Sequence, residues 1–192
     1  MDKKLMIRFL IRETIKVQNG KKHNDRLWDA IRKAHRDVMT GARQNNFPNY
    51  VEKNKANRNQ SLEHLYDVIS NETGPLCSKN LIQKLQEDDK TIEFTALQKL
   101  VNMTLKYLIL LNELDDTALA FDICEEKCDC PIDSIILQNL FKINGIPHEC
   151  WTKMKEPEYI QVQSEIKKYL GETYPQEQYG NIWFDFLKWN AD

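Results

Sequence analysis

The sequence lacks the long apolar run that a membrane-spanning helix needs. Crossing a bilayer takes about 20 consecutive, mostly apolar residues. The most hydrophobic stretch, residues 97–111, is interrupted by four polar side chains. These are Gln98, Lys99, Asn102 and Lys106. We therefore expect no association with a membrane.

The amino end lacks the apolar core of a secretory signal peptide. Arg8, Arg12 and Glu13 lie within the stretch that would have to be uncharged. Without export, the five cysteines, an odd number, are expected to stay thiols or to bind metal rather than to form disulfides. The sequence thus indicates a cytoplasmic protein.

The sequence also lacks the common catalytic signatures. It contains no Cys-His-Asn order, no Gly-x-Ser-x-Gly elbow, no Walker loop and no glycine-rich dinucleotide turn. These absences disfavour the usual hydrolases, NTPases and dehydrogenases, and no cofactor is expected. Whether the chain is an enzyme stays open at this point.

What is present is apolar spacing at three and four residues, which is typical of helices packed on a core. The spacing predicts helices over residues 5–20, 24–41, 61–70, 94–111 and 159–171, whereas β-branched alternation of strand length is nearly absent. With 41% hydrophobic and 29% charged residues, the chain has enough apolar side chains for a core. We predict an all-α, orthogonal multi-helix bundle of about seven to nine helices.

Prolines and glycines indicate where the later helices begin and end. Pro131 is expected to be the first residue of a helix over IDSIILQNLF, which puts Asp133 in the first turn. Gly145 should break that helix, and Gly171 should end the next one in a left-handed cap. A short acidic helix is expected over residues 115–124.

Charge divides the chain into two parts of opposite sign. Residues 1–60 carry 15 Lys and Arg against 6 Asp and Glu, which leaves 12 against 23 for residues 61–192. We predict a basic N-terminal helical segment, 1–60, and a main helical domain, 61–192, unless the two form one continuous domain. The basic segment is able to contact nucleic-acid phosphates, or to dock on the acidic remainder of the same chain or of a second copy.

Two segments carry a resemblance to known proteins. Residues 98–107 read QKLVNMTLKY, and residues 130–137 read CPIDSIIL. This pair resembles the Q-K-x-x-N-x-x-L-K-Y helix and the C-P-x-D-x-I-I-L segment of a family of small bacterial proteins of unassigned function. A more distant resemblance is to helix-hairpin-helix DNA glycosylases, in which a lysine-bearing helix precedes a catalytic aspartate at the start of a later helix.

The glycosylase resemblance implies that Asp133 is the catalytic acid or base. Such a carboxylate stabilises a cationic sugar or activates water after the base is flipped out. The resemblance also implies a ligand pocket lined by Gln98, Lys99, Asn102 and Lys106. The alternative is structural: Asp133 satisfies backbone N–H groups at a helix start, and the other four residues form the polar side of a core helix.

Five side chains that are able to bind zinc lie close together in the sequence. They are Cys124, Cys128, Cys130, His148 and Cys150. The Cys-x-x-x-Cys-x-Cys spacing differs from the two-residue knuckle of zinc ribbons, and cysteines are often simply buried. Zinc is therefore the candidate metal, with unligated thiols as the default interpretation.

Two functions from different classes follow from these observations. One is a nucleic-acid-associated helical protein with a glycosylase-like site around Asp133 and a basic segment that contacts DNA. The other is a non-enzymatic interaction module, a homo-oligomer, that assembles through its opposite charges and its aromatic tail, residues 181–190. A glycosylase-like site needs Asp133 beside a concave pocket that Lys99 or Asn102 faces, so the structure around Asp133 distinguishes the two.

Overall fold

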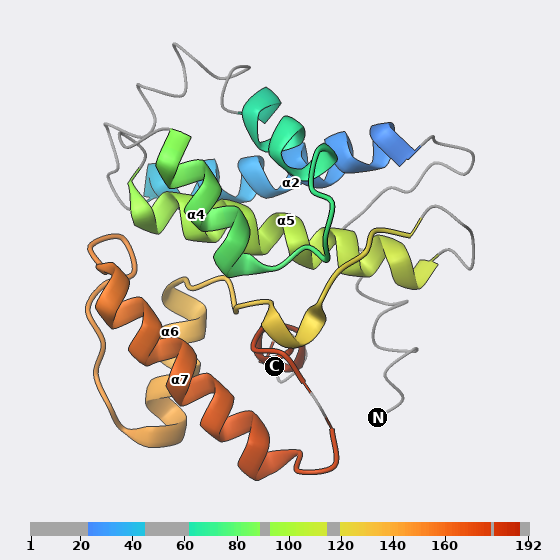
Figure 1. The fold of residues 1–192 in the computed structure, drawn as a ribbon. Coiled ribbons are helices and arrows are strands. Elements are labelled where there is room, and N and C mark those ends of the chain that lie inside the picture. Colours follow the sequence, from blue (N-terminus) through green and yellow to red (C-terminus); the bar gives the residue numbers. More distant parts are fainter. Residues whose placement is uncertain (1–22, 45–61, 89–92, 115–119, 178, 189–192) are drawn as a thin grey trace.

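The described part of the chain is built from helices in two layers (Figure 1). The computed structural model describes residues 23–44, 62–88, 93–114, 120–177 and 179–188. The helix expected at 5–20 and the connection expected at 45–59 lie outside these ranges. Within the ranges, the all-α multi-helix bundle that the sequence predicts is confirmed, and no helix is long and apolar enough to cross a membrane.

The elements follow one another along the chain without a sheet in the described residues. The helices are α2 (His23–Gln44), a short helix at 62–70, α4 (Ser78–Asp88), α5 (Phe94–Leu114), the 3-10 turn η1 (Glu125–Lys127), α6 (Ser134–Asn144), α7 (Glu156–Thr173) and α8 (Ile182–Lys188). A single parallel bridge joins Leu76 to Ile123, where the chain enters α4 and η1.

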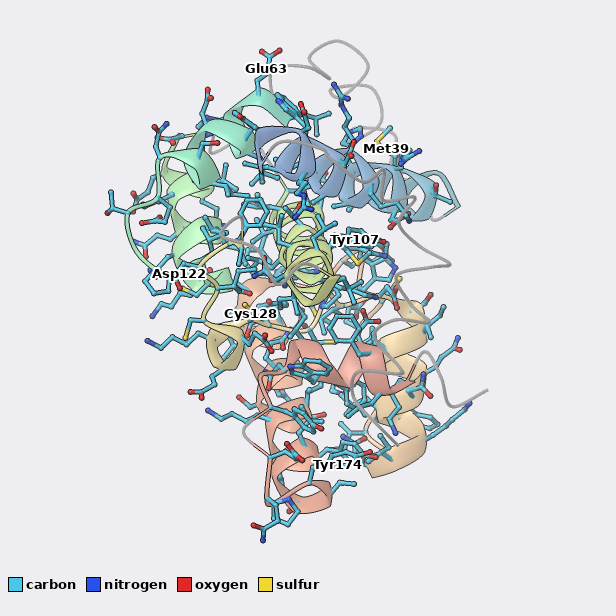
Figure 2. All side chains as sticks on the ribbon, turned by 90° about the vertical axis from the view of Figure 1, so that its right-hand side faces the viewer. Met39, Glu63, Tyr107, Asp122, Cys128 and Tyr174 are labelled. Carbon is cyan, nitrogen blue, oxygen red and sulfur yellow. The ribbon has the colours of Figure 1, made fainter. Side chains whose placement is uncertain are left out.

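α5 is the central helix of the first layer. α2 lies along it and α4 packs beside it, and Figure 2 shows α5 end-on in the middle of the molecule. On α2 the buried side chains Leu27, Ile31 and Val38 follow the spacing of one helix face. On α5, by contrast, every side chain over residues 95–111 is buried. A helix buried on all sides must lie between other elements.

α6 and α7 form the second layer, and α8 lies between the layers (Figure 1). Trp183 and Phe186 of α8 pack into the apolar cluster around α5. Phe184, on the other side of the same helix, packs into the cluster of α6 and α7. The described part of the aromatic tail therefore packs on the core and contributes to both apolar clusters.

The beginning of α6 differs from the sequence prediction. Pro131 is not helical, and α6 begins at Ser134. Asp133 has an extended backbone, with φ −144° and ψ −176°, and is the N-cap residue rather than part of the first turn. The reason is that an aspartate side chain is a better cap for the free backbone N–H groups than a proline, which lacks a side-chain acceptor.

The end of α7 also differs, whereas the end of α6 is as expected. Gly145 adopts the left-handed conformation, with φ 69°, and ends α6. α7 continues through Gly171 to Thr173, and its C-cap is Tyr174. The prediction of a left-handed cap at Gly171 is therefore wrong. The acidic helix expected over 115–124 is absent from residues 120–124, and residues 115–119 lie outside the described ranges.

Gly180 allows the chain to pass close to η1 as it enters α8. A Cβ atom at this position would lie 1.8 Å from the carbonyl oxygen of Glu125. Gly171, in α7, has no heavy atom within 4 Å of the same position. The two glycines therefore form a matched pair for substitution, because an added methyl group would clash with the backbone at Gly180 and would meet no heavy atom at Gly171.

We expect Gly180→Ala to lower the free energy of unfolding by about 1–3 kcal/mol, because a backbone carbonyl would have to move to admit the methyl group. Gly171→Ala is the control and should raise the free energy by about 0.5–1 kcal/mol, since alanine is the better helix former. Urea unfolding followed by circular dichroism measures both. An unchanged midpoint for Gly180→Ala would contradict the close approach to η1.

Candidate functional site

α5 carries four polar side chains through the interior of the protein. Gln98, Lys99, Asn102 and Lys106 are each no more than 6% exposed. A buried polar or charged group is costly unless a hydrogen bond or an ion pair replaces its contacts with water. The partners of these four side chains therefore indicate what they do.

Asp133 is held by the beginning of its own helix and by α5. Its Oδ1 accepts hydrogen bonds from the backbone N–H groups of Ile135, at 2.9 Å, and Ile136, at 3.0 Å. Its Oδ2 lies 3.4 Å from Lys99 Nζ, and that ammonium also lies 4.5 Å from the ring centre of Trp151. The structural alternative for Asp133 is thus observed directly, because both carboxylate oxygens contact the protein itself.

Gln98 and Asn102 bind different parts of the second layer. Gln98 Nε2 donates to the carbonyl of Ile132 at 3.4 Å, and Gln98 Oε1 accepts from the Ile132 N–H at 3.5 Å. Asn102 Nδ2 donates to the Tyr159 hydroxyl on α7 at 2.9 Å. Asn102 is therefore directed at α7 and not at Asp133.

Lys106 forms a buried ion pair with Asp185 of α8. The side chains of both residues are only 6% exposed. Burial raises the pKa of Asp185, and the neighbouring Lys106 ammonium opposes that shift. Removing one member of such a pair leaves the other charge buried without compensation. The pair therefore fixes α8 against α5.

The four α5 side chains do not converge on one cavity. Lys99 faces Asp133, but Gln98, Asn102 and Lys106 reach the backbone of Ile132, the hydroxyl of Tyr159 and the carboxylate of Asp185. Two surface hollows in the described structure are lined by other residues. Through these contacts, the predicted ligand residues have a structural role: they connect α5 to the second layer and to α8.

The cysteine and histidine candidates do not form a metal site in the described residues, where no three His, Cys, Asp or Glu side chains are placed to hold an ion. Burial raises the pKa of Cys128 and of Cys130, which favours the thiol over the ligating thiolate. His148 Nε2 lies 2.9 Å from Glu165 Oε2 on α7. The structure thus does not assemble the candidate zinc ligands Cys124, Cys128, Cys130, His148 and Cys150.

A carboxylate that the sequence analysis missed, Asp129, lies in a surface hollow of about 150 Å³ beside α7. Its Oδ2 accepts a hydrogen bond from the Tyr159 hydroxyl at 2.9 Å, and its backbone N–H donates to Ser78 Oγ at 2.7 Å. Tyr159 is 30 residues away along the chain, and Asn102, which donates to that hydroxyl, is on another helix. No local sequence pattern marks such a group, so only the fold reveals it.

Burial determines the protonation of this pair. It raises the pKa of Asp129, while the hydrogen bond from Tyr159 acts in the opposite direction. Burial, together with the charge of Asp129, also raises the pKa of Tyr159, so the phenol keeps its proton. A carboxyl group with a shifted pKa in a hollow is a recognised mark of a functional site, although structural networks produce such shifts too.

Comparison with known proteins found no matching family model, no similar curated protein and no similar solved structure. The resemblance to the small bacterial family and to the DNA glycosylases therefore stays a prediction. The function of the chain has to be argued from the geometry of its own residues.

The two contacts of Asp133 are separable by substitution. Asp133→Ala removes both the cap and the partner of Lys99, so it should lower the free energy of unfolding by about 0.5–2 kcal/mol for the cap alone, plus the cost of an unpaired ammonium. Asp133→Asn keeps the cap acceptor and removes only the charge, so we expect it to be intermediate. Chemical denaturation of the three proteins gives the order, and an alanine variant as stable as wild type would refute the cap.

Asp129 should make the protein less stable as the pH rises. Because the pKa of Asp129 is higher in the folded protein than in the unfolded chain, the folded state keeps a proton that the unfolded chain has lost. The free energy of unfolding therefore falls as the pH rises from about 3.9, the pKa of an aspartate in the unfolded chain, through the higher pKa of Asp129 in the folded protein. Asp129→Asn lacks this loss of stability. Its free energy of unfolding should therefore increase relative to that of wild type between acidic and neutral pH.

Urea midpoints measured across that pH range test the prediction. The exposed Asp122 provides the control, since Asp122→Asn should leave the shape of the pH profile as in wild type. Parallel profiles for Asp129→Asn and wild type would show that burial of Asp129 has no energetic cost.

Proposed function

We propose that this protein is a non-enzymatic interaction module that self-associates through α6. The observation that carries the proposal is a cluster of exposed apolar side chains on α6 and the turn after it. In the described residues, large hydrophobic side chains are exposed at five positions, and four of these lie within residues 135–146. They are Ile135, Phe141, Ile143 and Ile146, which are 39% to 52% exposed. Exposed apolar surface marks interaction sites on soluble proteins, and Ile135 and Ile143 share one face of α6.

The charge of α6 favours a protein surface over nucleic acid as the partner. Lys142 is the only charged residue in the helix. A nucleic-acid surface needs several cations to replace the counterions of the phosphates. An interface core, by contrast, is depleted in charge and rich in apolar side chains. The nucleic-acid hypothesis depends on residues 1–60, of which the structure describes only 23–44.

The spacing along α6 favours a second copy of the same chain. Ile135, Asn139 and Ile143 are four residues apart and share one helix face, with both isoleucines exposed. Two antiparallel α6 helices related by a two-fold axis near Asn139 would place Ile135 of one copy against Ile143 of the other. A two-fold interface requires this kind of self-complementary pattern.

The contacts of Asp133 support this module over the glycosylase-like enzyme. A catalytic carboxylate must reach substrate, and the oxygens of Asp133 already accept bonds from α6 and contact Lys99. The polar residues of α5 are likewise paired with protein groups. Each of these side chains therefore has a partner within the protein, which supports a structural role for the set.

Sedimentation equilibrium over a range of protein concentrations tests the proposal. Wild-type protein should approach twice the mass of one chain, and Ile143→Asp should weaken the dimer about tenfold or more, because it buries an unpaired charge against Ile135 of the other copy. Ile160→Asp is the matched control, since Ile160 is an isoleucine on α7 that is 57% exposed and outside the cluster. It should dimerise as wild type does.

Two outcomes would overturn the proposal. One is a wild-type protein that stays monomeric at every concentration. The other is a dimer that Ile143→Asp and Ile160→Asp weaken equally, which would place the interface away from α6.

A further inference from the structure

The segments that lead into α4 and η1 run side by side as a short parallel pair. The Leu76 N–H donates to the carbonyl of Asp122 at 2.8 Å, and the Cys124 N–H donates to the carbonyl of Leu76 at 3.0 Å. These two bonds form the bridge between Leu76 and Ile123. The next residues along the two segments are Cys77 and Cys124. The fold thus brings two cysteines from distant parts of the sequence to neighbouring positions.

The backbone at this pair suits a disulfide. Parallel strands lie about 4.8 Å apart, and disulfides join Cα atoms that are roughly 4.4–6.8 Å apart. Leu76 and Ile123 belong to the apolar cluster around α5 or pack against it. Because side chains alternate along an extended segment, Cys77 and Cys124 share the opposite face of the pair. The spacing and the direction that a disulfide requires therefore follow from the pairing.

A second contact holds Cys77 against the same segment. Ser78, the first residue of α4, accepts at Oγ a hydrogen bond from the Asp129 N–H at 2.7 Å. Cys77 thus lies between two residues, Leu76 and Ser78, that are both hydrogen-bonded to the segment around η1. Hydrogen bonds on both sides therefore hold Cys77 beside the segment that carries Cys124.

Of the five free thiols, Cys124 is the one at this junction that solvent reaches. Cys77 and Cys128 are buried, and the Cys128 Sγ donates to the Cys124 carbonyl at 3.4 Å. Burial raises the pKa of Cys128, and the nearby Cys77 adds to this shift, which keeps Cys128 a thiol. Cys130 is buried among α6 and α7, and Cys150 is exposed beyond α6. At this junction an oxidant therefore meets Cys124 first.

We propose that Cys77 and Cys124 form a reversible disulfide in the presence of hydrogen peroxide. The deprotonated Cys124 sulfur attacks the peroxide, the O–O bond breaks, and the products are a sulfenic acid and, after proton uptake, water. The Cys77 sulfur then attacks the Cys124 sulfur, and the sulfenic oxygen leaves as a second water with the Cys77 proton. Two thiols thus lose two electrons, which reduce one peroxide. A small dithiol reverses the reaction by thiol–disulfide exchange.

The disulfide would tie α4 to the segment that holds α8. The indole N–H of Trp183 donates to Glu125 Oε2 at 3.0 Å. The backbone N–H of Ile182 donates to the Cys128 carbonyl at 3.1 Å. A cross-link between distant residues restricts the unfolded chain more than the folded protein. The oxidised protein should therefore unfold at a higher urea concentration than the reduced protein. The site is separate from the α6 surface on which self-association depends.

Thiol counting on the full chain tests the proposal. Reduced protein is treated with a small excess of hydrogen peroxide, denatured, and labelled with N-ethylmaleimide before its mass is measured. Wild type should lose two of its five labels, and a digest should contain one linked pair of peptides, with Cys77 and Cys124. The bridge should form about tenfold or more faster in the folded protein than in urea, because only the fold holds the two thiols together.

Three variants locate the reaction. Cys77→Ser should leave Cys124 as a sulfenic acid, which dimedone traps at that residue. Cys124→Ser, a change at a partly exposed side chain, should form no disulfide. Cys150→Ser is the matched control, since Cys150 is an exposed cysteine away from the pair, and it should form the same bridge as wild type. Circular dichroism spectra show whether each variant is folded.

The proposal fails if folded wild type loses fewer than two labels, or if the linked peptides contain a different pair of cysteines. It also fails if the bridge forms as fast in urea as in the folded protein. These outcomes do not depend on whether the protein dimerises, because the disulfide lies within one chain and the α6 variant Ile143→Asp should form it unchanged.

Discussion

The arrangement of the two layers depends on the polar side chains that α5 buries, because each of them needs a hydrogen-bond or ion-pair partner. Over residues 95–111 the helix has no exposed side, yet it carries Gln98, Lys99, Asn102 and Lys106. The partners of these side chains lie just before α6, on α7 and on α8. Because an unpaired buried polar group costs more than an apolar contact gains, the second layer is favoured in the position that gives each of the four side chains a partner.

The same reasoning distinguishes three carboxylates, those of Asp133, Asp185 and Asp129, from one another. Asp133 has a helix end and an ammonium as partners, and Asp185 has Lys106, so each is compensated within the protein. Asp129 accepts one side-chain hydrogen bond, from Tyr159, and is among the residues that line a hollow. A compensated carboxylate holds a fold together, whereas an incompletely compensated one at the surface is available to a ligand. The proposal on α6 therefore concerns apolar side chains that the core does not bury.

Local sequence predicted most helices because apolar spacing and glycine chemistry act within a few residues. α2 and α5 are close to their expected positions, and α6 ends at Gly145, where the sequence indicates a break. At Pro131 two helix-start signals competed, and the aspartate two residues later prevailed because it supplies an acceptor to two N–H groups. At Gly171 the glycine signal did not end the helix, which continues for two more residues to Thr173 and has Tyr174 as its C-cap. Both errors concern helix ends, where the balance of competing caps is small.

By itself the sequence determined that the chain is helical and that it has a core, because periodicity and composition are properties of the chain alone. It also singled out the polar residues of α5 and Asp133, but not their role. Only the tertiary structure decided that these residues pair with the second layer, that the cysteine and histidine candidates form no metal-ligand group in the described residues, and that Asp129 and Tyr159 lie together at one hollow. The physical reason is that partnership between residues far apart in sequence depends on packing, which leaves no trace in local spacing.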